Sequence, residues 1–235
     1  MIYTILLAGG SGKRMGNTTV PKQFIEIRGI PIIIRTLKKL RRQERLDKIV
    51  VLCNMDYCAL LDDMLVKYGM TESVYILPAA ASRYESLAAG IDYIKENFAP
   101  SENDFVMIHD AVRPFTDDEV LSGAINRTRL HSAVVVANPL TVDVVEIDEN
   151  NCIGRTISRK HLYTDEAPQL FNINLLTKFA KKYSAEELAG ITDLATLFVD
   201  NGEKVYVMEG NADNIKITTD KDIAIAQRLA LGEEE

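Results

Sequence analysis

The stretch YTILLAGGSGKRMG (residues 3–16) joins a short apolar run to a glycine-rich loop. The apolar part is typical of a buried β-strand. Gly9, Gly10 and Gly12 permit backbone conformations with positive φ and let N–H groups approach a phosphate closely. The loop therefore predicts a phosphate site after the first strand, and a plain turn remains the alternative.

Two familiar glycine motifs do not match this loop. The dinucleotide-binding fingerprint requires G-x-G-x-x-G, whereas the glycines over residues 10–16 are spaced G-x-G-x-x-x-G. A P-loop requires Ser or Thr after its lysine, whereas Arg14 follows Lys13. A dinucleotide-binding protein is therefore disfavoured, although Arg14 and the nearby Lys22 still supply cations for a phosphate.

Strand and helix patterns alternate along the rest of the first half. The apolar runs predict strands at 3–8, 48–53, 73–77, 104–109 and 132–139, and the amphipathic segments predict helices at 31–45, 56–69, 83–97 and 117–131. Alternation of this kind indicates an α/β fold with a mostly parallel sheet covered on both faces.

The alternation stops after the fifth predicted strand. TVDVVEI (141–147) and CIGRTIS (152–158) flank the turn residues DENN and predict an inserted β-hairpin arm over about 140–160. The remaining pattern predicts helices near 172–183 and 192–201, strands at 204–210 and 214–218, and a helix at 219–231. With no repeat and no linker, we expect one domain over 1–235.

Composition and net charge narrow the classes of binding partner and the cellular location that we expect. A net charge of −7 argues against non-specific nucleic-acid binding. No apolar run approaches the roughly 20 residues that a membrane span needs, and the apolar N-terminus resembles a core strand more than a signal peptide. Three cysteines without CxxC spacing are typical of free thiols. We therefore expect a cytoplasmic protein with no membrane or nucleic-acid partner.

Two further charged clusters follow predicted strands. In HDAVRP (109–114), Asp110 ends an apolar strand and is a natural Mg²⁺ ligand, and a cap of a helix or turn is the alternative. We expect His109 to be structural. In NADNIKIT (211–218), Lys216 lies within a predicted strand, on the face opposite its apolar neighbours, and Asp213 stands at the strand's start. Alone, this segment would be a polar edge strand.

Together with the glycine loop, these clusters indicate nucleotidyl transfer. Loops after the carboxyl ends of parallel strands gather at one edge of the sheet, where ligands bind. A phosphate monoester is largely dianionic near neutral pH and can attack without a general base. The difficulty is charge, which Lys, Arg and Mg²⁺ can neutralise. The sequence contains no nucleophilic Ser or Cys motif that would favour another chemistry.

The chain also resembles a known family. LAGGSGKRMG, PKQF, SRYES (82–86), HDAVRP, SRKHLY…APQ (158–169), ITD (191–193) and GNADNIKIT are similar to the cytidylyltransferases that act on polyol phosphates. These comprise the 2-C-methyl-D-erythritol 4-phosphate enzymes and the related ribitol-5-phosphate enzymes. The resemblance covers nearly the whole chain and implies a Rossmann-like nucleotidyltransferase domain, with CTP and a polyol phosphate as substrates and Mg²⁺ as cofactor.

The resemblance implies roles for individual residues. The CTP-binding residues would be Leu7, Ala8, Gly9, Gly10, Gly12, Ala79, Ala80, Ala81, Arg83 and Ser86. Arg14, Lys22 and Lys216 would be catalytic, acting on the reacting phosphates. Asp110 and Asp213 would face Mg²⁺. The polyol phosphate would lie against Asp110, Arg113, Thr192 and Arg159, the last reaching in from the second subunit of a homodimer paired through the hairpin arm.

Two positions depart from the family pattern. Val144 and Ala167 stand where threonine is usual, so both departures remove a hydroxyl from the polyol side. HDAVRPF and KHLYTDEAPQLF are more similar to the ribitol-5-phosphate branch, which makes D-ribitol 5-phosphate the expected substrate. A 2-C-methyl-D-erythritol 4-phosphate enzyme of isoprenoid biosynthesis is one alternative. A catalytically silent nucleotide-binding regulator is another.

Overall fold

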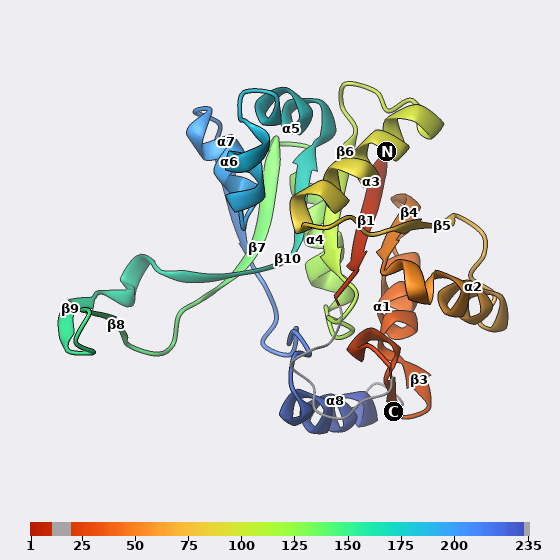
Figure 1. The fold of residues 1–235 in the computed structure, drawn as a ribbon, viewed down its shortest axis with the longest axis horizontal. Helices are drawn as coiled ribbons and strands as arrows, with labels where there is room; N and C mark the ends of the chain where they lie inside the picture. Colours follow the sequence, from red (N-terminus) through yellow and green to blue (C-terminus); the bar gives the residue numbers. More distant parts are fainter. Residues whose placement is uncertain (11–19, 233–235) are drawn as a thin grey trace.

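The computed structural model describes residues 1–10 and 20–232 (Figure 1). The predicted CTP residue Gly12 and the predicted catalytic residue Arg14 lie outside these ranges. The division into one domain over residues 1–235 stays a prediction. Within the described part of the chain, no helix combines the length and apolar character that crossing a membrane would require.

A seven-stranded sheet forms the centre, in the order β11-β7-β10-β6-β1-β4-β5. Its strands are β1 (Ile2–Ala8), β4 (Leu46–Cys53), β5 (Val74–Pro78), β6 (Phe105–Asp110), β7 (Ala133–Pro139), β10 (Tyr163–Asn172) and β11 (Val205–Glu209). Every pairing is parallel except those that β10 makes with β6 and β7. The predicted mostly parallel sheet is confirmed. The chain adds β4 and β5 on one side of β1 and then crosses over to add β6 on the other side. Such a reversal of strand order leaves a crevice at the carboxyl ends of the strands.

Helices cover both faces of the sheet, as predicted. They are α1 (Ile32–Arg41), α2 (Cys58–Lys67), α3 (Arg83–Phe98), α4 (Asp118–Arg127), α5 (Ile173–Ala180), α6 (Ala185–Gly190), α7 (Ala195–Asp200) and α8 (Asp220–Gly232). Apolar residues of α1, α2 and α4 form one core with one face of the sheet, and those of α3, α5, α6 and α7 form a second core with the other. Alternation along β1 serves both, since Leu6 belongs to the first core and Ile5 to the second.

A third, smaller core lies below the carboxyl edge of the sheet. There α8 packs near the short hairpin of β2 (Glu26–Ile27) and β3 (Ile30–Pro31), which the sequence analysis did not identify (Figure 1). The connecting residues Arg28 and Gly29 both adopt positive φ, at 49° and 73°. This is the geometry of a two-residue hairpin turn, so Gly29 is the signal that could have revealed it.

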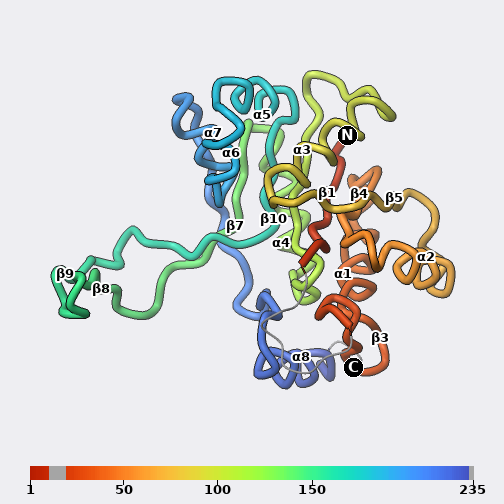
Figure 2. Tube along the Cα trace, viewed as in Figure 1, coloured from red at the N-terminus to blue at the C-terminus, as the bar shows by residue number. Residues whose placement is uncertain are grey.

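The predicted hairpin arm is confirmed. β8 (Val144–Ile147) pairs antiparallel with β9 (Ile153–Ile157), and both project away from the body of the molecule (Figures 1 and 2). Apolar side chains on it are exposed, including Val142 at 63% and Ile153 at 65%. A two-stranded hairpin with its apolar residues in solvent is marginal alone. Its role in dimerisation stays a prediction.

The sequence analysis misses one strand of the sheet and wrongly predicts another. β10 was absent from the predicted strands, because its first half, YTDE, is polar and its centre contains Pro168. Conversely, residues 214–218 do not form a strand. They run as an irregular segment in which Ile217 is fully buried in the third core and donates its N–H to the carbonyl oxygen of Val112 at 3.0 Å.

Candidate active site

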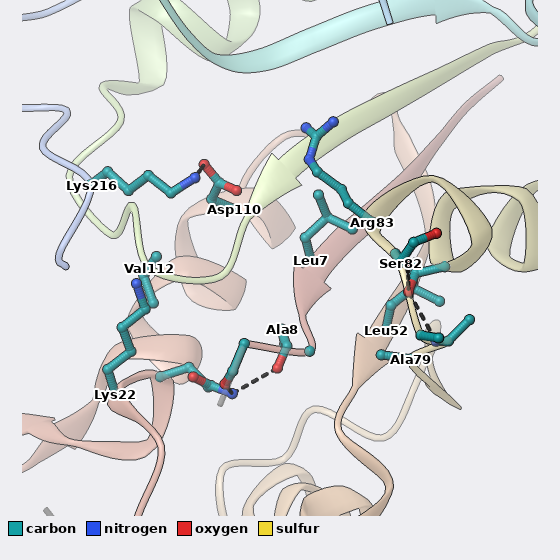
Figure 3. A pocket seen from close by; sticks show the side chains of 16 residues that line it. Leu7, Ala8, Lys22, Leu52, Ala79, Ser82, Arg83, Asp110, Val112 and Lys216 are labelled. Carbon is teal, nitrogen blue, oxygen red and sulfur yellow. Dashed lines mark hydrogen bonds and ion pairs between the residues drawn. The ribbon is translucent and has the colours of Figure 1, made fainter. Parts of the chain in front are cut away.

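A cavity of about 340 Å³ opens at the carboxyl ends of β1, β4 and β6 (Figure 3). Most of the predicted CTP and catalytic residues line it. Its walls contain Leu7, Ala8, Gly9, Gly10, Lys22, Gln23, Leu52, Ala79, Ala80, Ala81, Ser82, Arg83, Ser86, Asp110, Val112 and Lys216. We call it the nucleotide cavity.

One wall of the nucleotide cavity is the end of β1, held in place by Gln23. The Gln23 side chain is buried, and its Nε2 donates to the carbonyl oxygens of Ala8 at 2.7 Å and Gly10 at 3.1 Å. Neither Gly9 nor Gly10 has the positive φ that the sequence analysis allowed for. Gly9 instead permits a close approach, since an added Cβ would lie only 2.6 Å from Cβ of Ala79.

Sequence reasoning missed Gln23, although PKQF was recognised. A single glutamine between a lysine and a phenylalanine produces no periodic signal. Only its burial and its two hydrogen bonds to the carbonyl oxygens of Ala8 and Gly10 identify it as the residue that holds the end of β1.

The opposite wall is an alanine-rich turn that leads into α3. Ser86 is buried; its Oγ donates to the carbonyl oxygen of Ser82 at 2.8 Å and accepts from the N–H of Ala80 at 2.9 Å. Ser82 and Glu85 form a capping box that fixes the start of α3. The positive end of the α3 dipole therefore lies at this wall, where it favours an anion. The small side chains of Ala79, Ala80 and Ala81 at this wall are suited to a flat ring.

The charged end of the nucleotide cavity centres on Asp110. Lys216 Nζ lies 3.0 Å and Arg113 Nε 3.1 Å from the same carboxylate oxygen, Oδ2. Burial disfavours the charged form of this carboxyl group, but Lys216 and Arg113 outweigh it and hold the pKa of Asp110 below its usual value. Asp110 is therefore a carboxylate at neutral pH.

A second cavity, of about 270 Å³, adjoins the first and shares Arg83, Asp110 and Lys216 with it. Its other lining residues are Ile108, His109, Arg113, Asp165, Glu166, Ala167, Gln169 and Thr192. We call it the polyol cavity, because the predicted polyol-phosphate residues Asp110, Arg113 and Thr192 line it. Arg83, at the start of α3, is bonded to the segment around Thr192, since its Nη1 donates to the carbonyl oxygen of Thr192 at 3.1 Å.

His109 lies at the base of this cavity and is buried. Its Nε2 lies 3.1 Å from Oγ1 of Thr116, and its Nδ1 lies 3.0 Å from the carbonyl oxygen of Asp110. Burial lowers the pKa of His109 to about 4, which outweighs the opposing effect of the Asp110 carboxylate. The ring is therefore neutral at physiological pH, which agrees with the predicted structural role.

Two predicted residues lie apart from both cavities. Asp213 is not among the described residues that line either one. Arg159 lies at the base of the arm, where its Nη1 donates to the carbonyl oxygen of Thr141 and its Nε lies 3.8 Å from Asp143. Neither the metal role of Asp213 nor the substrate role of Arg159 follows from this one chain, and both stay predictions.

The described residues suit Mg²⁺ only as a partly protein-bound ion. They contain no group of three His, Cys, Asp or Glu side chains that could hold a metal. Asp110 offers a hard carboxylate oxygen at the junction of the two cavities. Mg²⁺ commonly binds one or two carboxylates and takes its other ligands from water and substrate phosphates, so this donor set fits it.

Comparison with known proteins gives a consistent result. A model of the family of 2-C-methyl-D-erythritol 4-phosphate cytidylyltransferase matches residues 2–231. The ribitol-5-phosphate cytidylyltransferase of Lactiplantibacillus plantarum is 34% identical over 229 residues, which cover 97% of this chain and 98% of that protein.

Solved structures agree over the same length. The 4-diphosphocytidyl-2C-methyl-D-erythritol synthase of Anaerococcus prevotii superposes with a TM-score of 0.82 at 30% identity and covers 98% of both chains. The 2-C-methyl-D-erythritol 4-phosphate cytidylyltransferase of Francisella tularensis superposes with a TM-score of 0.80 at 26% identity, over 97% of this chain and 98% of that one.

Proposed function

The chain belongs to the 2-C-methyl-D-erythritol 4-phosphate cytidylyltransferase family of nucleotidyltransferases, and we propose that it joins CTP to D-ribitol 5-phosphate to give CDP-ribitol and pyrophosphate. The observation that carries the proposal is the meeting of two cavities at Arg83, Asp110 and Lys216. One cavity has the small-residue walls that suit a nucleotide. The other has the polar walls that suit a polyol.

The geometry supports a direct displacement. CTP occupies the nucleotide cavity, with cytosine against Ala79–Ala81 and its phosphates beside Gly9, Gly10 and Lys22. An oxygen of the polyol phosphate attacks the α-phosphorus, and the bond from that phosphorus to the β-phosphate oxygen breaks. Pyrophosphate leaves with the bonding electrons. A dianionic phosphate needs no general base, so the residues act by position and charge.

Charge neutralisation falls to the lysines. Lys216 and Lys22 both line the nucleotide cavity and can face oxygens whose negative charge grows in the transition state. Arg83 belongs to both cavities and stands where the two phosphates approach each other. Arg14, which lies outside the described residues, is proposed to assist them.

We propose Asp110 as the Mg²⁺ ligand, with Asp213 as a second carboxylate. Bound there, Mg²⁺ would offset negative charge on the phosphates of CTP. Asp110→Asn retains the shape of the side chain but is a poorer ligand for a hard cation. We expect the variant to need a higher Mg²⁺ concentration for half-maximal pyrophosphate release. A Mg²⁺ titration that superimposes on that of the unaltered protein would contradict the assignment.

We also propose a homodimer paired through the arm. Exposed apolar side chains of the arm, including Val142, Ile147 and Ile153, supply surface for a second copy, and isologous pairing is the commonest arrangement. Exchange of arms would bring Arg159 to the neighbouring polyol cavity. The three cysteines are free, which agrees with the proposed cytoplasmic location.

The test is pyrophosphate release from CTP and Mg²⁺ with a panel of polyol phosphates. We expect release with D-ribitol 5-phosphate and none without a polyol phosphate. Release only with 2-C-methyl-D-erythritol 4-phosphate would favour the second candidate function, which the names of the family and of the structural relatives support. Binding of CTP without any release would favour a silent regulator.

A further inference from the structure

The polyol cavity contains a carboxylate that neither the sequence analysis nor the family comparison assigns. Glu166 lies on β10, where the pairing with β7 shifts register between Asp165 and Gln169. Its side chain is only 16% exposed and lines the cavity beside Ala167. Burying a carboxylate costs free energy unless partners compensate, so its partners indicate what holds it there.

Two neutral amides hold Glu166, one on each oxygen. Nδ2 of Asn138 donates to Oε1 at 3.0 Å, and Nδ2 of Asn214 donates to Oε2 at 3.1 Å. Both amides are fixed in turn. Asn138 accepts from the N–H of Gly210 at 3.1 Å, and Asn214 accepts from the hydroxyl of Thr116 at 2.8 Å. The carboxylate is therefore held in one orientation.

An ion pair with Arg113 does not account for the burial of the Glu166 carboxylate. Arg113 Nη1 lies 3.9 Å from Oε2 of Glu166, but this nitrogen donates to the carbonyl oxygen of Asn214 at 2.7 Å. Arg113 Nε donates to Asp110 at 3.1 Å. The close hydrogen bonds of the guanidinium group therefore go to other acceptors.

The amides leave acceptor capacity on Glu166. A carboxylate offers roughly four acceptor positions, and the two amide bonds use two of them. Since a carboxylate only accepts, a ligand group that binds it must donate. A hydroxyl can do so, whereas a methyl group or a phosphate cannot. The two ends of the cavity differ in charge. The junction with the nucleotide cavity holds two cations, Lys216 and Arg83, against one carboxylate, Asp110, whereas Glu166 lies on the wall of β10.

We propose that Glu166 determines polyol specificity by accepting a hydrogen bond from a secondary hydroxyl of an unbranched polyol phosphate. It takes over recognition at a place where the threonine expected at position 167 is alanine. The substrate phosphate lies at the cationic junction, and the hydroxyl chain lies against Glu166. This proposal rests on the proposed function, because it assigns a residue within the same site.

The first test is Glu166→Gln, which keeps the size of the side chain and removes its charge. A hydrogen bond to a charged group is worth enough that we expect the KM for D-ribitol 5-phosphate to rise about tenfold or more, with the KM for CTP unchanged. Glu209→Gln, on the exposed end of β11, is the matched control and should change neither constant. A purely structural role would instead alter both constants or lower thermal stability alone.

The second test compares altered substrates, first with the unaltered protein, an arm that needs no variant to fold, and then with Glu166→Gln. Analogues of D-ribitol 5-phosphate that lack one secondary hydroxyl are compared by kcat/KM. We expect one analogue to lose about tenfold or more, and the same analogue to be penalised least by Glu166→Gln. If every analogue stays within about twofold of D-ribitol 5-phosphate, or if Glu166→Gln keeps the discrimination of the unaltered protein, the Glu166 proposal is overturned while the proposed function stands. If the unaltered protein does not use D-ribitol 5-phosphate, the proposed function fails and this proposal falls with it.

Discussion

The two cavities meet at three residues but are built from different parts of the chain. The nucleotide cavity consists largely of strand ends and the turn before α3, where glycine, alanine and serine bring the backbone close to the ligand. The polyol cavity consists of longer side chains from β6, β10 and the segment around Thr192. The backbone therefore shapes the binding site of the nucleotide, and individual side chains select the second substrate. The first cavity should tolerate little change in shape, and the second should change specificity through single residues.

The largest effect should come from the two lysines that line the nucleotide cavity, of which Lys216 also lies where the cavities meet. We expect Lys216→Ala and Lys22→Ala each to lower kcat about a hundredfold or more, because they offset charge that develops only in the transition state. Lys221→Ala, exposed in the first turn of α8, is the matched control and should retain full turnover. Folded Lys216→Ala protein with unaltered kcat would show that the junction does not carry the chemistry.

The arm should affect the polyol cavity alone. We expect Arg159→Ala to raise the KM for the polyol phosphate by about tenfold or more, because a lost charge-assisted hydrogen bond to phosphate costs about 1.5–3 kcal/mol. The KM for CTP should hardly change. Arg155→Ala is the control, since Arg155 pairs with Glu146 within the arm at 2.8 Å.

Mixing variants tests whether the arm acts across a dimer. Arg159→Ala and Lys22→Ala are each impaired, but a heterodimer of the two contains one site with both residues intact. We expect activity to return in the mixture. If subunits exchange and the mixture still shows no gain over its components, Arg159 does not serve the neighbouring site.

We expect CTP binding in the nucleotide cavity to be sensitive to a single added methyl group. Gly9→Ala places a Cβ 2.6 Å from Cβ of Ala79, so the two walls must separate. Overpacking of this kind costs about 1–3 kcal/mol, and we expect the KM for CTP to rise about tenfold while the KM for the polyol phosphate stays the same. Gly190→Ala, at the end of α6 and outside both cavities, is the control, because nothing lies within 4 Å of its added Cβ. Equal effects of the two substitutions would contradict the close approach.

We expect substitution of His109, a buried residue in the lining of the polyol cavity, to have the smallest effect on turnover. Its pKa is lowered from 6.5 to about 4, so the folded state disfavours protonation. The stability that this provides is fully present above pH 6.5 and is lost as pH falls from 6.5 towards 4, because only the unfolded state takes up the proton readily. The loss amounts to about 3 kcal/mol at 1.36 kcal/mol per pH unit.

Denaturant unfolding between pH 4 and 7 measures this effect. We expect His109→Gln to flatten the acid side of the stability profile, while kcat at pH 7 changes little. The exposed His161 provides the control, since His161→Gln should leave the profile unaltered. Parallel profiles for His109→Gln and the unaltered protein would mean that the ring is not kept neutral by burial.

The sequence predicts the nucleotide cavity better than the polyol cavity, for a physical reason. Residues 7–10 run into a glycine-rich stretch whose composition indicates a close approach to a ligand, and residues 79–86 form a short contiguous stretch that the family resemblance assigns to the nucleotide. The polyol cavity depends on β10. The first half of β10 is polar, so its sequence does not indicate a strand in the middle of the sheet. Glu166 acquires its orientation from Asn138 and Asn214, which are 28 and 48 residues away. No local pattern reveals such a network.

Direct competition between two substrates tests the division of labour most directly. The unaltered protein receives CTP, Mg²⁺ and equal concentrations of D-ribitol 5-phosphate and 2-C-methyl-D-erythritol 4-phosphate, and the initial rates of both CDP-products are measured by mass. The ratio of these rates equals the ratio of the two kcat/KM values, which is the measure of specificity. We predict that CDP-ribitol forms at least about ten times faster, because ribitol offers Glu166 a run of secondary hydroxyls, whereas methylerythritol offers a single one beside a methyl group that cannot donate. Equal rates, or an excess of the methylerythritol product, would contradict the account.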